Sequence, residues 1–172
     1  MCLSALERPE SHALLAELEN SVLIDDPGDI VRTVDKQFSV GFRFGSVHDV
    51  ADGFRVAELV PRIEDPLIRC SFRSMFSWAL LLAAHYVGAH DQAELLIADA
   101  SEYRVDPAVP YGYSTMAAAL AGTHQFQEAL DAVDTSARLA ARMHDENGIQ
   151  NAYAIRTRIL LQAGEVAEAC AT

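Results

Sequence analysis

A short pattern recurs along the chain and limits the folds that are open to it. A turn residue is followed two positions later by a side chain that can pack and five positions later by a small or apolar residue. The occurrences are Gly45, Val47, Val50; Gly88, His90, Ala93; His124, Phe126, Ala129; and Gly164, Val166, Ala169. Their last residues are separated by 43, 36 and 40 positions. A pattern that returns at such intervals predicts a structural repeat.

The segments between these turns have the spacing of amphipathic helices. Apolar residues recur at intervals of three and four within Leu14–Val22 and Leu130–Ala141, which is the period of one helix face. Glycine permits the left-handed geometry that ends a helix, and a small residue one turn into the next helix lets an antiparallel partner approach closely. We therefore predict an all-α fold of antiparallel helix pairs, stacked because one pair cannot bury its apolar stripe alone.

Prolines and capping residues indicate where the helices begin. Proline is tolerated in the first turn of a helix, where its missing N–H costs nothing, and several prolines stand just before or inside apolar segments: Pro9, Pro27, Pro66 and Pro110. Capping signals lie nearby, at Ser46 with Asp49, at Asp65 before Pro66, and at Asn147 with Gln150. Asp25 and Asp26, beside Pro27 and Gly28, are interpreted as a turn or cap.

One segment departs from helical spacing. Phe38, Val40, Phe42 and Phe44 alternate with smaller or polar residues in the period-two manner of a strand. No partner strand is evident, and a single strand is not stable alone. We therefore predict a helix that starts at about Asp29, is interrupted near Gly41 and stops before Gly45.

Composition indicates one folded domain over residues 1–172, less regular in 1–64 and more clearly repeated in 65–172. Hydrophobic residues make up 51% of the chain and charged residues 22%, values typical of folded proteins. The formal net charge of −12 repels phosphate backbones, and no basic patch offsets it, so direct contact with nucleic acid is not expected. Basic protein partners are left open.

The expected location is the cytoplasm. Cys2, Cys70 and Cys170 lie far apart, without the spacing of a redox pair or zinc site, and free thiols suit a reducing compartment. The first ten residues lack the pattern of a secretory signal. The most apolar stretch, Met75–Val87, is shorter than the roughly 18 residues that suggest a membrane span, so we interpret it as a buried helix.

The repeats resemble tetratricopeptide units, which form a right-handed superhelix. The resemblance is carried by three sets of residues: Tyr113, Met116, Ala117, Leu120 with Phe126, Ala129, Leu130, Val133; Tyr153, Leu160, Gly164, Val166, Ala169; and Leu80, Leu81, Ala84, Gly88, Ala93, Ile97, Ala100. Together they cover the chain from about Leu67 to the C-terminus. The spacing exceeds the usual tetratricopeptide period of about 34 residues.

Within this superfamily, three segments resemble the repeat region of large bacterial LuxR-type, MalT-like transcriptional regulators. They are Asp65 to Tyr86, the segment Ala98-Asp-Ala-Ser-Glu-Tyr-Arg, and Gln150-Asn-Ala-Tyr-Ala-Ile-Arg. Such regulators place an ATPase module before the repeats and a helix-turn-helix after them, and neither flank lies within this sequence. The resemblance implies a signal-sensing or protein-interaction region, as a fragment of a regulator or a shortened relative. A free-standing adaptor that docks a partner protein is the alternative.

No catalytic residue, metal ligand or cofactor is assigned from the sequence. There is no G-x-S-x-G elbow and no phosphate-binding loop. The histidines are His12, His48, His85, His90, His124 and His144. His85, His90 and His124 raise a metal hypothesis because they lie near predicted turns, but their spacing is not that of H-E-x-x-H, and turn or surface histidines explain it better.

The expected binding surface is the inner face of the stack, built by the first helix of each pair. Aromatic side chains with a few polar groups suit a protein, a peptide or a small effector ligand. The residues assigned to this groove are Met75, Trp78, His85, Tyr86, Tyr111, Ser114, Asn151, Arg158 and Gln162. Met75 and Trp78 could equally belong to the core.

Two further expectations concern charge and association. Arg69 and Arg73 lie one turn apart and could bind an anion, although a solvated edge or pairing with Glu64 or Asp65 is favoured. The final helix has little to cover its apolar side, so we expect the C-terminal end to self-associate or to pair with a missing continuation.

Overall fold

The computed structural model describes residues 26–44 and 50–172, and over these residues the chain contains helices and turns but no strand. The predicted all-α class is confirmed for this part of the chain. The helices are α2 (Pro27–Phe44), α3 (Val50–Ala57), α4 (Pro66–Leu82), α5 (Tyr86–Glu102), α6 (Val109–Gly122), α7 (Phe126–Arg142), α8 (Glu146–Ala163) and α9 (Val166–Ala169). Two short 3₁₀ helices, Val60–Arg62 and Asp106–Ala108, lie between them.

The turns from α4 onward share one backbone geometry at a constant interval. Each contains a residue with positive φ, and these residues follow one another at intervals of 20: Ala84, Arg104, His124, His144 and Gly164. The residue after each of them donates its backbone N–H to a carbonyl five positions earlier, as in His85 to Leu80 at 2.8 Å and Glu165 to Leu160 at 2.9 Å. This is the Schellman bond that closes a helix end. Two successive helices with their turns therefore span 40 residues, from Ala84 to His124 and again from His124 to Gly164.

The interval corrects one turn predicted from the sequence. Gly88 lies in the first turn of α5, not between helices, and the chain reverses at Ala84 instead. Glycine is the usual residue for a left-handed helix end, but the backbone bonds from Ala84 to Leu81 and from His85 to Leu80 hold this geometry without it. The predicted turns at His124 and Gly164 are confirmed.

Helix starts follow the predicted prolines, with one correction. Asp65 caps α4 by accepting from the backbone N–H of Leu67 at 2.8 Å, and Pro66 follows it. Asp26 accepts in the same way from Gly28 at 2.9 Å before α2. The predicted cap at Asn147 is wrong, because Asp145 accepts from the N–H of Gly148 at 3.0 Å and α8 begins one residue before Asn147.

Helix α2 runs through Gly41 without the interruption predicted there, and the structure describes it to Phe44. Its alternating pattern arises from packing, since Phe38 and Val40 are both buried in a helix that contacts both α3 and α4. Predictions that fall on residues 1–25 and 45–49 lie outside the described residues. They concern Pro9, the helix over Leu14–Val22, the turn at Gly45 and the cap at Ser46.

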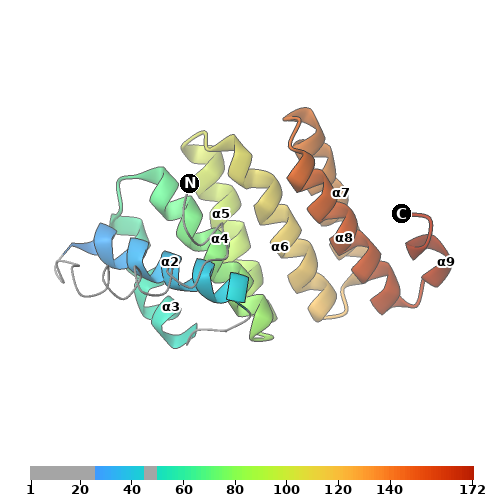
Figure 1. The fold of residues 1–172 in the computed structure, drawn as a ribbon, viewed down its shortest axis with the longest axis horizontal. Helices are drawn as coiled ribbons and strands as arrows, with labels where there is room; N and C mark the ends of the chain where they lie inside the picture. Colours follow the sequence, from blue (N-terminus) through green and yellow to red (C-terminus); the bar gives the residue numbers. More distant parts are fainter. Residues whose placement is uncertain (1–25, 45–49) are drawn as a thin grey trace.

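The helices pack in chain order (Figure 1). Each helix from α4 to α8 contacts the next, while α6 also contacts both α4 and α8. Helix α2 crosses α4 at the N-terminal end of the described structure, and α9 packs against α8 at the other end. Helix α6 therefore lies at the centre of this arrangement.

The described core contains three hydrophobic clusters, of which the smallest joins α4 and α5 around Leu96. The first joins α2, α3 and α4 and contains Phe38, Phe72 and Phe76, all buried. The second joins α6, α7 and α8 and is built largely from alanine, as at Ala117, Ala129 and Ala152. A bilayer-spanning helix would need more length and hydropathy than any helix among the described residues has.

Candidate functional site

A cavity of about 220 Å³ lies where the first turns of α5 meet the last turn of α6. Its lining combines apolar and polar side chains: Tyr86, Val87, His90, Ala119, Leu120, Thr123 and Gln125. The amide of Gln125 donates to the Thr123 hydroxyl at 2.8 Å, and that hydroxyl donates to the Leu120 carbonyl at 3.0 Å. The polar end of the cavity is therefore held in place by the α6–α7 turn.

Gly122 allows Tyr86 to lie against α6. A Cβ at Gly122 would overlap the Cδ1 atom of the Tyr86 ring, at a separation that real Cβ atoms do not reach. Because Tyr86 starts α5 and Gly122 ends α6, this contact fixes the two helix ends beside each other. The wall of the cavity therefore depends on glycine for close approach and not for backbone freedom, since helical φ suits any residue.

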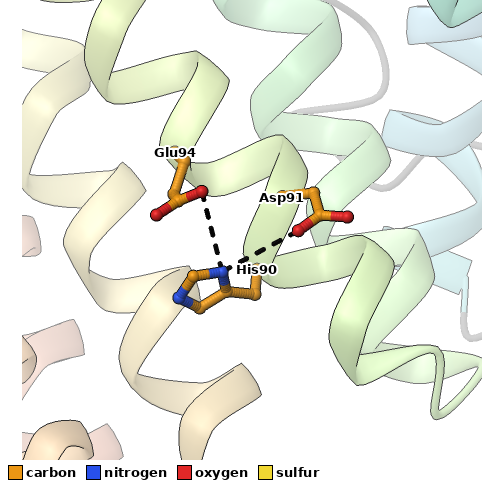
Figure 2. A group of neighbouring side chains, drawn as sticks. All are labelled: His90, Asp91 and Glu94. Atoms are coloured by element: carbon orange, nitrogen blue, oxygen red, sulfur yellow. Dashed lines mark ion pairs between the residues drawn. The ribbon is translucent and has the colours of Figure 1, made fainter.

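His90 lines the cavity and also belongs to a cluster on the surface of α5 (Figure 2). Its Nδ1 atom is 4.0 Å from Asp91 Oδ1 and 4.0 Å from Glu94 Oε2. Figure 2 shows both carboxylates directed toward the same edge of the imidazole ring. One candidate ligand atom from each residue lies within 4.8 Å of the others, so the three side chains could hold a metal ion.

The predicted groove residues of α4 and α5 have different environments. Met75 is partly buried against the aromatic cluster, and Trp78 packs against the alanine cluster of α6 to α8. His85 is exposed at the start of α5, with its ring 6.3 Å from that of Phe54. Tyr86 lines the cavity. The structure therefore gives Met75 and Trp78 core contacts, which was the alternative interpretation of these residues.

The predicted groove residues of α6 are used within the scaffold. Ser114 is 1% exposed, and its hydroxyl lies 2.9 Å from that of Ser136 on α7. It therefore belongs to the α6–α7 contact and does not line an open surface. Tyr111 donates its hydroxyl to Asp145 at 3.0 Å. Burial raises the pKa of this hydroxyl, and the hydrogen bond to Asp145 raises it further.

The predicted groove residues of α8 are the more accessible ones. Arg158 and Gln162 are exposed, and Asn151 is partly exposed. Tyr111 and Asn151 lie 40 positions apart, and Trp78 and Arg158 lie 80 apart, so each pair occupies equivalent places in the repeat. Apart from His85, the exposed members lie on the last full helix, against which only the short α9 packs on the C-terminal side of the described structure.

The sequence suggested that Arg69 and Arg73 pair with Glu64 or Asp65, but in the structure they do not. Both bind Asp99 of α5, Arg69 through Nη2 and Arg73 through Nε, each at 2.5 Å. Arg73 also donates to Gln92 at 3.1 Å, and Arg69 lies 5.0 Å from the Tyr103 ring centre. The hydrogen bond with Asp99 raises the pKa of Arg69. These arginines therefore join α4 to α5 and are not an open anion site.

A second buried carboxylate lies on the opposite side of α4. Asp35 of α2 is 3% exposed; its Oδ2 accepts from the Ser71 hydroxyl at 2.9 Å and lies 3.3 Å from Lys36 Nζ. Its Oδ1 is buried and has no hydrogen-bond partner among the described residues. Burial raises the pKa of this carboxyl, against the opposing effects of Lys36 and Ser71.

The sequence pointed to His90 but not to its partners. Glu94 stands four residues after His90, which places both side chains on one helix face, and this spacing is visible in the sequence. The prediction of a turn at Gly88 put His90 at a helix end and so hid the pairing.

Comparison of the chain with protein-family models, with curated proteins and with solved structures found no match.

Proposed function

We propose that the chain is a non-catalytic binding module of stacked helix pairs with tetratricopeptide-like architecture. We further propose that it is the signal-sensing or protein-interaction region of a bacterial transcriptional regulator. The observation that carries the proposal is the constant interval between the helix ends from Ala84 to Gly164. Helix pairs of equal length can stack through equivalent faces, as repeat proteins require.

The order of helix contacts supports the stacked arrangement. The first helices of successive pairs, α4, α6 and α8, contact one another in series through α6. In solenoids the helices of one class form an extended concave surface that receives partners. The interval of 40 residues from Ala84 to His124 is longer than the tetratricopeptide period of about 34.

The exposed residues of α4 and α8 define the surface that we assign to the partner. Leu82 at the end of α4 is 53% exposed, and Arg158 and Gln162 are exposed on α8. This surface offers an apolar contact and hydrogen-bond donors, which suits a peptide segment or a small effector. Its described residues form no cluster of titratable groups of the kind that general acid–base catalysis needs.

Chemical crosslinking in extracts of the native cell tests the surface assignment. The wild-type chain is compared with Leu82→Ser and Arg158→Glu, and with Arg138→Glu as a control because Arg138 is exposed on α7. We expect one protein or ligand to be crosslinked to the wild type and the control, and to be lost from both groove variants. Equal crosslinking to all four chains would place the binding surface elsewhere.

The regulator assignment has a separate test, which is the native gene on both sides of the segment that encodes the chain. A helix-turn-helix domain encoded in the same frame after Thr172 is the expected result. A stop codon at that point contradicts the regulator assignment, and the adaptor then becomes the better description of the same binding module.

A further inference from the structure

We propose that His90, Asp91 and Glu94 bind one divalent transition-metal ion, with zinc as the reference ion, at the edge of the α5–α6 cavity. The inference is independent of the proposed function, because these three residues occupy adjacent turns of one helix whatever the module binds elsewhere. The donor set is one imidazole nitrogen and two carboxylates, which are ligands that zinc accepts.

The backbone already brings the ligand atoms close to coordinating distance. Zinc binds imidazole nitrogen and carboxylate oxygen at about 2.0–2.2 Å, so two ligands on one tetrahedral ion lie roughly 3.4 Å apart. The distances from His90 Nδ1 to Asp91 and to Glu94 are both 4.0 Å. Side-chain rotation would have to close these two gaps by about 0.6 Å and bring the Asp91 and Glu94 oxygens, which lie within 4.8 Å of each other, to the same separation. The Asp91 and Glu94 side chains are 64% and 60% exposed and therefore have room to rotate.

Charge favours an ion at this place. Two carboxylates and a neutral imidazole carry a charge that one divalent ion cancels, and the formal net charge of the whole chain is −12. The field of such a chain concentrates cations near its surface. Three protein ligands also leave a position open for water or another donor. His90 lines the same cavity as Thr123 and Gln125, so the proposed ion would lie at the edge of that cavity.

Calorimetric titration of the full chain with zinc chloride tests the site. Cys170 is an exposed free thiol, so the titration uses a Cys170→Ser background to remove a competing ligand. We expect one zinc ion per chain, and an affinity that falls about tenfold or more in His90→Gln and in Glu94→Gln.

His144→Asn is the matched control. His144 is a histidine in the α7–α8 turn with φ of 56°, a backbone conformation that asparagine tolerates. The zinc affinity of the His144→Asn variant should equal that of the Cys170→Ser parent, and all variants should keep the helical circular dichroism of that parent. The site is excluded if the parent binds no zinc, if His90→Gln binds it with unchanged affinity, or if His144→Asn loses it.

A cobalt spectrum provides a second measurement. Cobalt(II) follows zinc into sites of this donor type, and its visible absorption reports on ligand number and geometry. We expect the absorption to change on binding to the parent protein and this change to be absent in Glu94→Gln. An identical spectrum in both chains would show that Glu94 is not a ligand and would overturn the proposal.

Discussion

Helix α4 packs against α2 on one side and α5 on the other, and the two contacts are built differently. Toward α2, large rings fill the space, with Phe38 and Phe76 stacked at 5.5 Å between centroids. Toward α5, small residues allow close approach, since Ala89 and Ala100 are fully buried. Helix α4 therefore meets large aromatic rings on its α2 side and small side chains of α5 on the other.

Each of these contacts also buries one carboxylate, and the comparison shows what such a group requires. Asp99, on the α5 side, has an arginine on each oxygen. Asp35, on the α2 side, has partners on Oδ2 only, as far as the described residues show. A buried charge is tolerated when it is paired and hydrogen-bonded and is costly otherwise. We therefore expect the two aspartates to respond in opposite ways to neutralisation.

The largest effect is expected for Asp99→Asn. Removing the charge leaves Arg73, whose side chain is 5% exposed, and the nearby Arg69 without their counter-ion. Loss of one partner from a buried ion pair costs about 3–5 kcal/mol. Urea denaturation followed by circular dichroism at neutral pH measures the free energy of unfolding. A loss of unfolding free energy below about 1 kcal/mol, which is the range of exposed ion pairs, would show that water solvates the two arginines in place of Asp99.

Gly53→Ala should have the next largest effect, on the aromatic side. A Cβ at Gly53 would overlap the Phe76 ring and would lie 2.9 Å from Phe38 Cζ, so the stacked rings would have to move. Overpacking of a filled core typically costs about 1–3 kcal/mol. The same urea denaturation experiment measures the change in the free energy of unfolding. An unchanged or increased stability would show that the aromatic layer repacks readily.

Gly88→Ala is the matched substitution on the α5 side and should be stabilising. The added Cβ would meet Leu80 at 3.6 Å and Phe54 at 3.5 Å, which are ordinary contact distances. Alanine is favoured over glycine inside a helix by about 0.8–1.0 kcal/mol. A rise in the thermal midpoint relative to wild type is the expected result. A fall would mean that α5 is packed more tightly against its neighbours than these distances indicate.

The smallest effect, and one that depends on pH, is expected for Asp35→Asn. Because burial raises the native pKa of Asp35 above its ordinary value of 3.8, the native state binds the proton more tightly than the unfolded state. The stability that this proton contributes is therefore complete below pH 3.8 and is lost as the pH rises through the native pKa.

Asparagine cannot ionise, so stability relative to wild type should increase across this pH window and then stay constant up to neutral pH. The buried amide and the lost contact with Lys36 offset part of the gain. Urea denaturation at several pH values gives the difference curve. A difference that is flat with pH, or that decreases as the pH rises, would contradict a raised pKa for Asp35.

The sequence predicted helix type and most helix starts because local signals control them. Pro66 after Asp65 marks the start of α4 by chemistry that acts within one turn. The reversal at Ala84 was not predictable in this way, since alanine carries no turn signal. Its left-handed backbone is held by the backbone hydrogen bonds from Ala84 to Leu81 and from His85 to Leu80, which leave no mark in the sequence. The misplaced turn then shifted the expected register of α5.

The partners of buried charges depend on contacts between helices, which no local pattern contains. Asp99 lies 30 residues after Arg69 and 26 after Arg73, whereas Glu64 and Asp65 are close to Arg69 in the sequence. Sequence proximity therefore pointed to the wrong carboxylates. Among the candidate ligands, the pairing of His90 with Glu94 was within reach because both lie on one helix face.

The constant interval between helix ends bears on how such a chain can gain or lose length. Consecutive helices run in opposite directions. If a single helix and its turn were removed, the next helix would therefore have to start at the opposite end of the stack. Removing or duplicating a whole pair, with both joints in turns such as Ala84 and His124, keeps every apolar stripe facing its neighbour. Changes of complete helix pairs are therefore the insertions and deletions that this architecture tolerates best.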